Sequence, residues 1–398
     1  MKKIVYCIAL STSIFAAISA CKKSSEESTT DVSADYPNIK AAFGDNINLN
    51  ALENYSKQTI PAYITRDNTN SNPITDKGAT LGRVLFYDKN LSKNNTISCA
   101  SCHKQDFAFG DNAIASVGVN GTTGRHSMRL VNARFSLEGK FFWDERAANL
   151  EAQTVMPIQD HKEMGFSGTN GDENFSALIT KLQNIKYYQE FFKFVYGDAT
   201  VTQVRIQNAL AQFVRSIQSF DSKYDAGRAT APNDQANFAN FTAQENTGKN
   251  LFLTPPVFDA TGTRTAGGLG CAGCHRPPEF DIDPNSLNNG IIGVIGATGI
   301  DLTNTKSPTL RNVGRANGNE NGPFMHTGNL ATLQNVIGHY GTINIAPGNN
   351  NLDPKLRPNG MGQKLNLTAN EVNAVIAFIR TLDGNDVYTN KKWASPFL

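Results

Sequence analysis

Two short motifs of the same type carry the clearest chemistry in the sequence. Cys99-Ala100-Ser101-Cys102-His103 and Cys271-Ala272-Gly273-Cys274-His275 both follow the pattern CxxCH. In this pattern the two thiols add to the vinyl groups of a haem as thioethers, and the adjacent histidine is the proximal ligand of the iron. A CxxC pair alone would also suit zinc or thiol redox chemistry, but the histidine after each pair and the repetition disfavour both. The sequence therefore predicts two covalent haem c groups, ligated by His103 and His275.

The N-terminus is typical of an exported protein. Met1-Lys2-Lys3 is basic, and the apolar run of residues 4–17 is too short to span a bilayer. Ile18-Ser19-Ala20-Cys21 resembles a bacterial lipobox. We expect residues 1–21 to be a lipoprotein signal peptide and Cys21 to carry the lipid; an ordinary cleaved signal with an incidental cysteine is the alternative. The expected location is the periplasm, with the protein anchored to the membrane through this lipid.

The overall charge excludes one class of partner. The 398 residues include 37 Lys and Arg against 35 Asp and Glu, a formal net charge of +2, and no long block of like charge. We therefore expect no nucleic-acid partner. The 33 glycines suit a chain with long loops, in which haem groups supply much of the core.

The helices that position the motifs follow from apolar periodicity. A helix is expected from Asp76, because Leu81 and Leu85 share one face. A C-terminal helix is expected after the capping box that joins Thr368 to Glu371. The predicted helices besides the first cover residues 174–196, 201–220 and 367–382. No segment shows the alternation of several strands, so the predicted fold class is mainly α.

A weak internal repeat suggests the domain organisation. Gly82-Arg83-Val84-Leu85-Phe86 precedes the first CxxCH motif, and Gly248-Lys249-Asn250-Leu251-Phe252 precedes the second. This predicts two tandem cytochrome c-like domains, each with one covalent haem c. The predicted units are a flexible tether and N-terminal wrap over 22–58, an N-terminal domain over 59–228 and a C-terminal domain over 229–398.

Several further segments resemble signatures of the bacterial dihaem cytochrome c peroxidases and their MauG-like relatives. Phe142-Trp143-Asp144-Glu145-Arg146-Ala147 is followed by Leu150-Glu151-Ala152-Gln153, by Pro157 and by Glu163-Met164-Gly165. In the second half, residues 308–313 and 323–328 are similar to the second-domain signatures. The resemblance keeps the same order from about Gly78 to Asp383.

This resemblance implies a division of labour between the two haems. The haem on His103 would be the peroxidatic one, and the haem on His275 would accept electrons from a small donor protein. Glu163 matches the acid-base carboxylate of the peroxide pocket, and Gln153 and Pro157 match its neighbours. Trp143 matches the tryptophan that lies between the two haems.

The chain departs from the family pattern at the far side of each iron. Many members have a histidine ligand in the loop after the first haem motif, where this chain has Val119. We therefore expect a first haem that lacks this histidine and is five-coordinate or water-bound without reductive activation. The alternatives are His126 and His161 as substitute ligands. Classical members place a methionine on the second iron and MauG-like members a tyrosine, and Tyr340 falls at that position. Met325 and Met361 are the nearby alternatives.

The family resemblance also implies a calcium ion between the domains. Asn321 and Pro323 match its binding region. His126 stands where an asparagine ligand would be expected, which weakens the case because calcium prefers oxygen ligands.

Three functions are compatible with these features. The leading prediction is an enzyme, a cytochrome c peroxidase that reduces hydrogen peroxide with electrons from a small cytochrome c or cupredoxin. The first alternative is a MauG-like dihaem oxidase acting on a protein or organic substrate. The second is a non-catalytic dihaem electron-transfer cytochrome. Family members are often dimers, so a homodimer is also expected from the resemblance.

Overall fold

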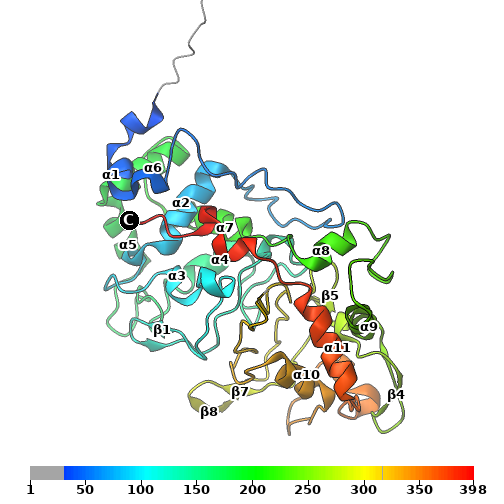
Figure 1. Ribbon diagram of the computed structural model, residues 1–398. Helices are drawn as coiled ribbons and strands as arrows, with labels where there is room; N and C mark the ends of the chain where they lie inside the picture. The colour runs from blue at the N-terminus through cyan, green and yellow to red at the C-terminus, as the bar shows by residue number, and fades with distance from the viewer. Residues whose placement is uncertain (1–30, 316) are drawn as a thin grey trace, which may run out of the picture.

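The computed structural model describes residues 31–315 and 317–398, and it is mainly helical in this part of the chain (Figure 1). The predicted signal peptide and the lipobox at Cys21 lie outside the described residues. The helices are α1 (Pro37–Phe43), α2 (Asp76–Tyr87), α3 (Cys99–Cys102), α4 (Leu150–Val155), α5 (Phe175–Gln183), α6 (Lys186–Tyr196), α7 (Gln203–Ser216), α8 (Lys223–Arg228), α9 (Ala243–Leu253), α10 (Leu333–Gly341), α11 (Ala369–Arg380) and α12 (Asp386–Thr389). Among the described residues, no helix is both long and apolar enough to span a membrane.

The strands are short and form four separate antiparallel hairpins in the described chain. β1 (Val117–Gly118) pairs with β2 (Gly121–Thr122), and β3 (Pro256–Phe258) with β4 (Arg264–Gly267). β5 (His275–Arg276) pairs with β6 (Asp281–Ile282), and β7 (Gly293–Val294) with β8 (Ala297–Ile300). No extended sheet forms from these strands, which agrees with the predicted fold class.

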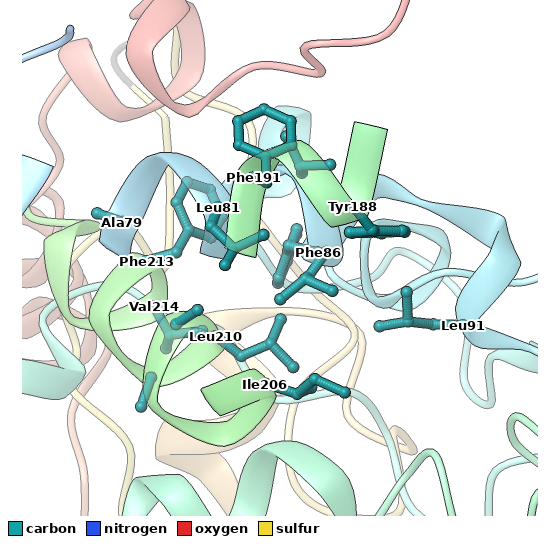
Figure 2. Close-up of a cluster of buried hydrophobic side chains, with 14 of the residues drawn as sticks. Ala79, Leu81, Phe86, Leu91, Tyr188, Phe191, Ile206, Leu210, Phe213 and Val214 are labelled. Carbon is teal, nitrogen blue, oxygen red and sulfur yellow. The ribbon is translucent and has the colours of Figure 1, made fainter. Parts of the chain in front are cut away.

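A first hydrophobic core forms where α2 crosses α7. Thr75 caps α2, and Thr202 caps α7. Figure 2 shows Leu81 and Phe86 of α2 together with Leu210 and Phe213 of α7 in this core. The first CxxCH motif, in α3, packs against α2 of this core.

A second core repeats this crossing with α9 and α11. The glycines of the sequence repeat explain the correspondence. A Cβ atom on Gly82 would stand 2.0 Å from the Ala209 carbonyl oxygen, and one on Gly248 would stand 1.8 Å from that of Ala374. The repeat therefore marks the two points at which helix backbones touch.

One predicted helix is divided in two. The apolar pattern over residues 174–196 continues without a gap, but α5 ends at Gln183 and α6 begins at Lys186. Ile185 has extended backbone angles, with ψ at 121°. The break turns the chain so that Leu182 and Tyr188 are both buried in the first core.

Both ends of the described chain pack on the first core. Phe43 of α1 lies 5.0 Å from Phe397 between ring centroids, and Trp393 is fully buried. The Tyr55 hydroxyl donates a hydrogen bond to the Lys392 carbonyl at 2.5 Å. In Figure 1 the red C-terminal segment runs from α11 back to the body that contains α1 and α2. The domain limits stay predictions, but this segment joins the two cores.

Candidate functional site

The first CxxCH motif forms a single helical turn, α3. Ser98 caps this turn and makes a capping box with Ser101. His103 follows at the end of the turn, and its Nδ1–H donates to the Phe109 carbonyl at 3.0 Å. This bond sets the tautomer and leaves Nε2 free to bind a metal. Burial lowers the pKa of His103, so the ring is kept in the neutral form that ligates iron.

The two cysteines of this motif are in surroundings that disfavour thiolates. Burial raises the pKa of Cys99 to about 12 and that of Cys102 to about 11. Among the described residues no group of three or more His, Cys, Asp or Glu side chains could hold a metal ion by itself. Neutral thioethers fit this environment better than thiolate ligands of zinc do.

A cavity of about 600 Å³ opens over Cys99, Cys102 and His103. Apolar side chains of α2 and α7 form one wall, including Phe86, Leu210 and Val214. A volume of this size with an apolar wall is usual for a cofactor site. The residues present therefore fit a haem, which the two cysteines would attach and His103 would ligate.

The predicted residues Gln153, Pro157 and Glu163 line this same cavity. Gln153 lies on α4, and Glu163 lies on the turns that follow. Burial raises the pKa of Glu163 to about 7, with a contribution from the charge of Asp160 and an opposing one from Arg146. A carboxyl group with this pKa can take up and return a proton near neutral pH.

The turn that carries Glu163 is held in place by Asp160. Oδ1 of Asp160 accepts hydrogen bonds from the backbone N–H of Lys162 at 2.8 Å and of Glu163 at 3.1 Å. The backbone N–H of Gly165 donates to the Asp160 carbonyl at 2.9 Å, and Gly165 has a φ of +79°. Sequence reasoning missed Asp160, whose only signal is its position three residues before Glu163.

The β1–β2 hairpin is fastened to this turn from the other side. The N–H of Val119 donates to the Glu163 carbonyl at 3.0 Å, and that of Asn120 to the Lys162 carbonyl at 3.1 Å. A Cβ atom on Gly118 would stand 2.1 Å from the Lys162 carbonyl, so only glycine permits this approach. Val119 thus lies in the loop where the sequence resemblance places a histidine ligand in many relatives. Its side chain packs towards Gly165.

A second, smaller cavity of about 330 Å³ lies beside the first. Arg146, Pro157, Asp160 and Glu163 line both cavities. The Arg146 guanidinium stacks 3.5 Å from the centroid of the Phe142 ring. Since Asp160 is exposed, this second cavity connects the solvent with the Glu163 carboxyl.

Trp143 lies at the junction of the two halves of the chain. Its Nε1–H donates to the His126 carbonyl at 2.6 Å, and its own carbonyl accepts a hydrogen bond from the Lys306 N–H at 2.7 Å. Its ring centroid is 6.3 Å from that of His326. Trp143 lines the large cavity and is 9% exposed. Its indole therefore packs between His126 of the first half and His326 of the second.

Comparison with known proteins agrees with this geometry. Residues 76–231 match the family model described as "Di-haem cytochrome c peroxidase". The chain is similar to the dihaem cytochrome c peroxidase and MauG-like family over this part of its length. The predicted resemblance is confirmed, and this family consists of dihaem oxidoreductases.

Curated relatives of the chain are named in two ways. It is 29% identical to methylamine utilization protein MauG of Methylophilus methylotrophus, over 85% of this chain and 90% of the relative. It is also 29% identical to cytochrome c551 peroxidase of Nitrosomonas europaea, over 77% of this chain and 80% of the relative. Equal identity to both leaves the choice between peroxidase and oxidase to the site.

Solved structures agree with the fold. A MauG-like protein associated with microbial copper homeostasis superimposes with a TM-score of 0.66 at 26% identity, covering 85% of this chain and 99% of that protein. The diheme peroxidase BthA from Burkholderia thailandensis gives a TM-score of 0.59 at 20% identity, covering 84% and 89%. The latter similarity supports the fold alone.

The second CxxCH motif is built like the first. Nδ1–H of His275 donates to the Phe280 carbonyl at 3.1 Å, and burial lowers the pKa of this histidine to about 4. Burial raises the pKa of the Cys271 thiol to about 12 and also raises that of Cys274. These residues fit a second haem in the same way as those of the first motif.

Tyr340 and Met325 meet at one amide near this motif. Nδ2 of Asn289 donates to the Tyr340 hydroxyl at 3.4 Å and to the Met325 sulfur at 3.5 Å. Burial raises the pKa of Tyr340 well above its ordinary value, with a smaller contribution from Cys274. His339 is engaged with the Asn289 carbonyl at 3.0 Å, and Met361 is 48% exposed. Tyr340 and Met325 therefore remain the two candidate ligands.

The side chains predicted near calcium do not fit that ion. Nδ2 of Asn321 donates to the Tyr388 hydroxyl at 2.6 Å, and the Arg315 guanidinium already donates to its Oδ1 at 2.8 Å. Nδ1 of His126 donates to the Ala113 carbonyl at 2.9 Å. A cation on the amide oxygen and an imidazole are poor surroundings for calcium. Pro323 offers only its backbone carbonyl, so these three residues do not form a calcium site.

His326 is a functional candidate that spacing alone did not select. It is buried and lines the large cavity, and neither of its ring nitrogens has a hydrogen-bond partner among the described residues. Its Nε2 lies 3.9 Å from Asp301 Oδ2. Its place in the signature stretch of residues 323–328 was the available signal.

Proposed function

We propose that this protein is a dihaem cytochrome c peroxidase, which converts hydrogen peroxide, two electrons and two protons into two water molecules. The observation that carries the proposal is the Glu163 carboxyl, which lines the same cavity as Cys99, Cys102 and His103. We propose that each half of the chain forms a cytochrome c-like domain with one covalent haem. A bound haem at His103 would supply the iron on which the O–O bond is cleaved.

Proton movement is the part that the chain's own residues perform. The ionised Glu163 carboxylate takes a proton from the peroxide oxygen nearer to the iron. It then returns this proton to the far oxygen, which leaves as water. Gln153 and Pro157 line the cavity beside Glu163 and restrict where peroxide can lie. The hydrogen bonds of Asp160 and Val119 to the Glu163 backbone keep the carboxyl in position during both transfers.

The electron route of the proposal uses Trp143. We propose that a small cytochrome c or cupredoxin reduces the haem on His275 and that Trp143, at the junction of the halves, lies on the path to the first site. A steady-state assay with peroxide and reduced cytochrome c tests the function. Turnover that depends on both reagents is expected, and no turnover in protein with two haems per chain would count against a peroxidase.

A MauG-like oxidase is the second candidate, and the position of Tyr340 favours it. A phenolate ligand would lower the potential of the second haem relative to a thioether and make reduction by an ordinary donor harder. In that case turnover with reduced cytochrome c is very slow, and peroxide produces a long-lived oxidised state spread over both haems. A non-catalytic electron-transfer cytochrome would instead show no reaction with peroxide.

We also propose that the chain is exported to the periplasm and anchored by a lipid on Cys21. Support comes from the apolar run and lipobox in the sequence. Metabolic labelling with a fatty acid tests it: label is expected in the wild-type protein and absent from a Cys21→Ser variant. The expected homodimer is tested by sedimentation of the mature protein.

A further inference from the structure

A guanidinium without a counter-charge lies in the cavity of the first motif. Arg129 lines this cavity, and its Nε is buried without a hydrogen-bond partner among the described residues. Its one hydrogen bond runs from Nη2 to the Thr309 carbonyl at 3.5 Å, at the long limit for such a bond. The side chain as a whole is half-buried, because part of it faces the cavity.

Two other arginines of the described chain, Arg125 and Arg311, have carboxylate partners. Arg125 lines the same cavity and pairs with Asp144 at 2.9 Å and with Asp301 at 2.6 Å. Arg311, fully buried, pairs with Asp225 at 2.9 Å. A guanidinium taken out of water is more stable when an anion neutralises it. Arg129 is therefore available to an anion in the cavity that the described residues do not supply.

The nearest acidic groups do not fill this need. Burial lowers the pKa of Arg129 to about 10, and the charges of Tyr388 and Asp383 only partly oppose this. Burial also raises the pKa of Asp383 to about 7, so this carboxyl is only partly ionised at neutral pH. Oδ1 of Asp383 accepts a hydrogen bond from the Gly314 N–H at 3.0 Å, and no ion pair joins Asp383 to Arg129 in the described structure.

The position of Arg129 relates it to the first haem site. It follows Met128, and both residues line the same cavity as His103. Gly110 lies against it, since a Cβ atom there would stand 2.9 Å from Arg129 Cγ. The base of the Arg129 side chain is thus held in the wall of the cavity that His103 also lines.

We propose that Arg129 binds a propionate carboxylate of the haem held by Cys99, Cys102 and His103. A haem has two carboxylates, and a guanidinium can pair with one through two parallel hydrogen bonds. The inference rests on the proposed haem at this site and names one contact that its carboxylates make. The paired charge offsets the negative propionate and favours the reduced iron, so Arg129 raises the potential of this haem.

The test is a redox titration of the haem-loaded protein without peroxide, followed by absorption. Arg129→Gln is expected to lower one midpoint potential and to leave the other nearly unchanged. The lowered potential becomes pH-dependent, because the freed propionate now protonates within the accessible range. Arg129→Lys keeps the charge and is expected to restore most of the potential.

A matched control is Arg134→Gln, which removes a guanidinium from the same segment. Arg134 pairs with Asp67 at 2.5 Å. Its replacement by Gln is expected to leave both haem potentials unchanged. Added chloride separates the two possible sources of the anion. A free ion makes the wild-type potential depend on chloride concentration, and that result would overturn the proposal.

The haem content of each variant separates two kinds of failure. Wild-type protein that binds no haem would refute the proposed function itself. Arg129→Gln with two haems per chain and unchanged potentials would refute only the propionate contact. Should the glutamine variant not fold, the lysine variant decides: its single point charge predicts a smaller downward shift, and identical potentials at every pH would refute the contact.

Discussion

Oδ1 of Asp160 accepts a hydrogen bond from the backbone N–H of Glu163 at 3.1 Å. An exposed carboxylate thereby fixes the main chain of a half-buried one three residues later, and its charge also acts on the same group. Asp160 is a positioning residue in this arrangement, because it acts on the reaction through Glu163.

Replacing Asp160 by Asn keeps an acceptor for this hydrogen bond but removes the charge. Glu163 must be ionised to accept a proton, so the rate with peroxide rises with pH through its pKa of about 7. Asp160→Asn lowers that pKa, and we expect the acid limb of the pH profile of kcat/KM to move to lower pH. Glu173→Gln removes an exposed charge elsewhere and serves as control. An unchanged acid limb would show that the charge of Asp160 has no effect on Glu163.

Glu163→Gln removes the proton acceptor while keeping the shape of the side chain. We expect kcat/KM for peroxide to fall by about 10²–10⁴-fold, the usual contribution of general acid-base catalysis. Haem content and the spectrum of the second haem should not change. A loss of less than about tenfold would assign the proton transfer to another group.

The presence of Val119 where relatives have a histidine ligand bears on the spin state expected for the first iron in the fully oxidised protein. Its hairpin is fastened to the Glu163 turn by two backbone hydrogen bonds, and no histidine stands in this loop. We expect a high-spin ferric signal by EPR and reaction with peroxide without prior reduction. Two purely low-spin signals would mean that another side chain occupies the sixth position.

Tyr340 and Met325 can be separated by a pair of variants. If the phenol is the ligand of the second iron, Tyr340→Phe changes the low-spin spectrum of one haem and Met325→Leu does not. Burial raises the pKa of Tyr340 well above its ordinary value, so the phenol is protonated at neutral pH unless a metal binds its oxygen. The opposite pattern of spectral changes would identify the Met325 sulfur as the ligand.

Replacing Gly248 or Gly338 by alanine is expected to change the free energy of unfolding in opposite directions. A Cβ atom at Gly248 would stand 1.8 Å from the Ala374 carbonyl, so Gly248→Ala forces α9 and α11 apart. We expect a loss of about 1–3 kcal/mol in the free energy of unfolding by denaturant. Gly338 of α10 has nothing within 4 Å of such an atom, and Gly338→Ala should stabilise by about 0.5–1 kcal/mol. Equal effects at both positions would contradict this view of the crossing.

Local patterns predicted much of the fold. The capping box at Thr368 and the apolar faces around Leu81 and Leu85 predict α11 and α2, because these signals act over a few residues. The break at Asn184 was not predicted, since it depends on how α5 and α6 pack on the same core. Short hairpins such as β1–β2 also lack any alternation long enough to detect.

The site was predictable where residue type dictates chemistry. The CxxCH motifs identify their own function, whereas Glu163 was found only through a family resemblance. Arg129 gave no sequence signal at all. Its importance comes from a missing partner, and a missing partner becomes visible only when the neighbours of a side chain are known.

The return of the C-terminal segment to the first core constrains the order of events during folding. Trp393 is fully buried there, and Tyr55 and Tyr87 donate hydrogen bonds to the carbonyls of Lys392 and Trp393. The half of the protein made first therefore cannot finish folding until the last residues have been synthesised.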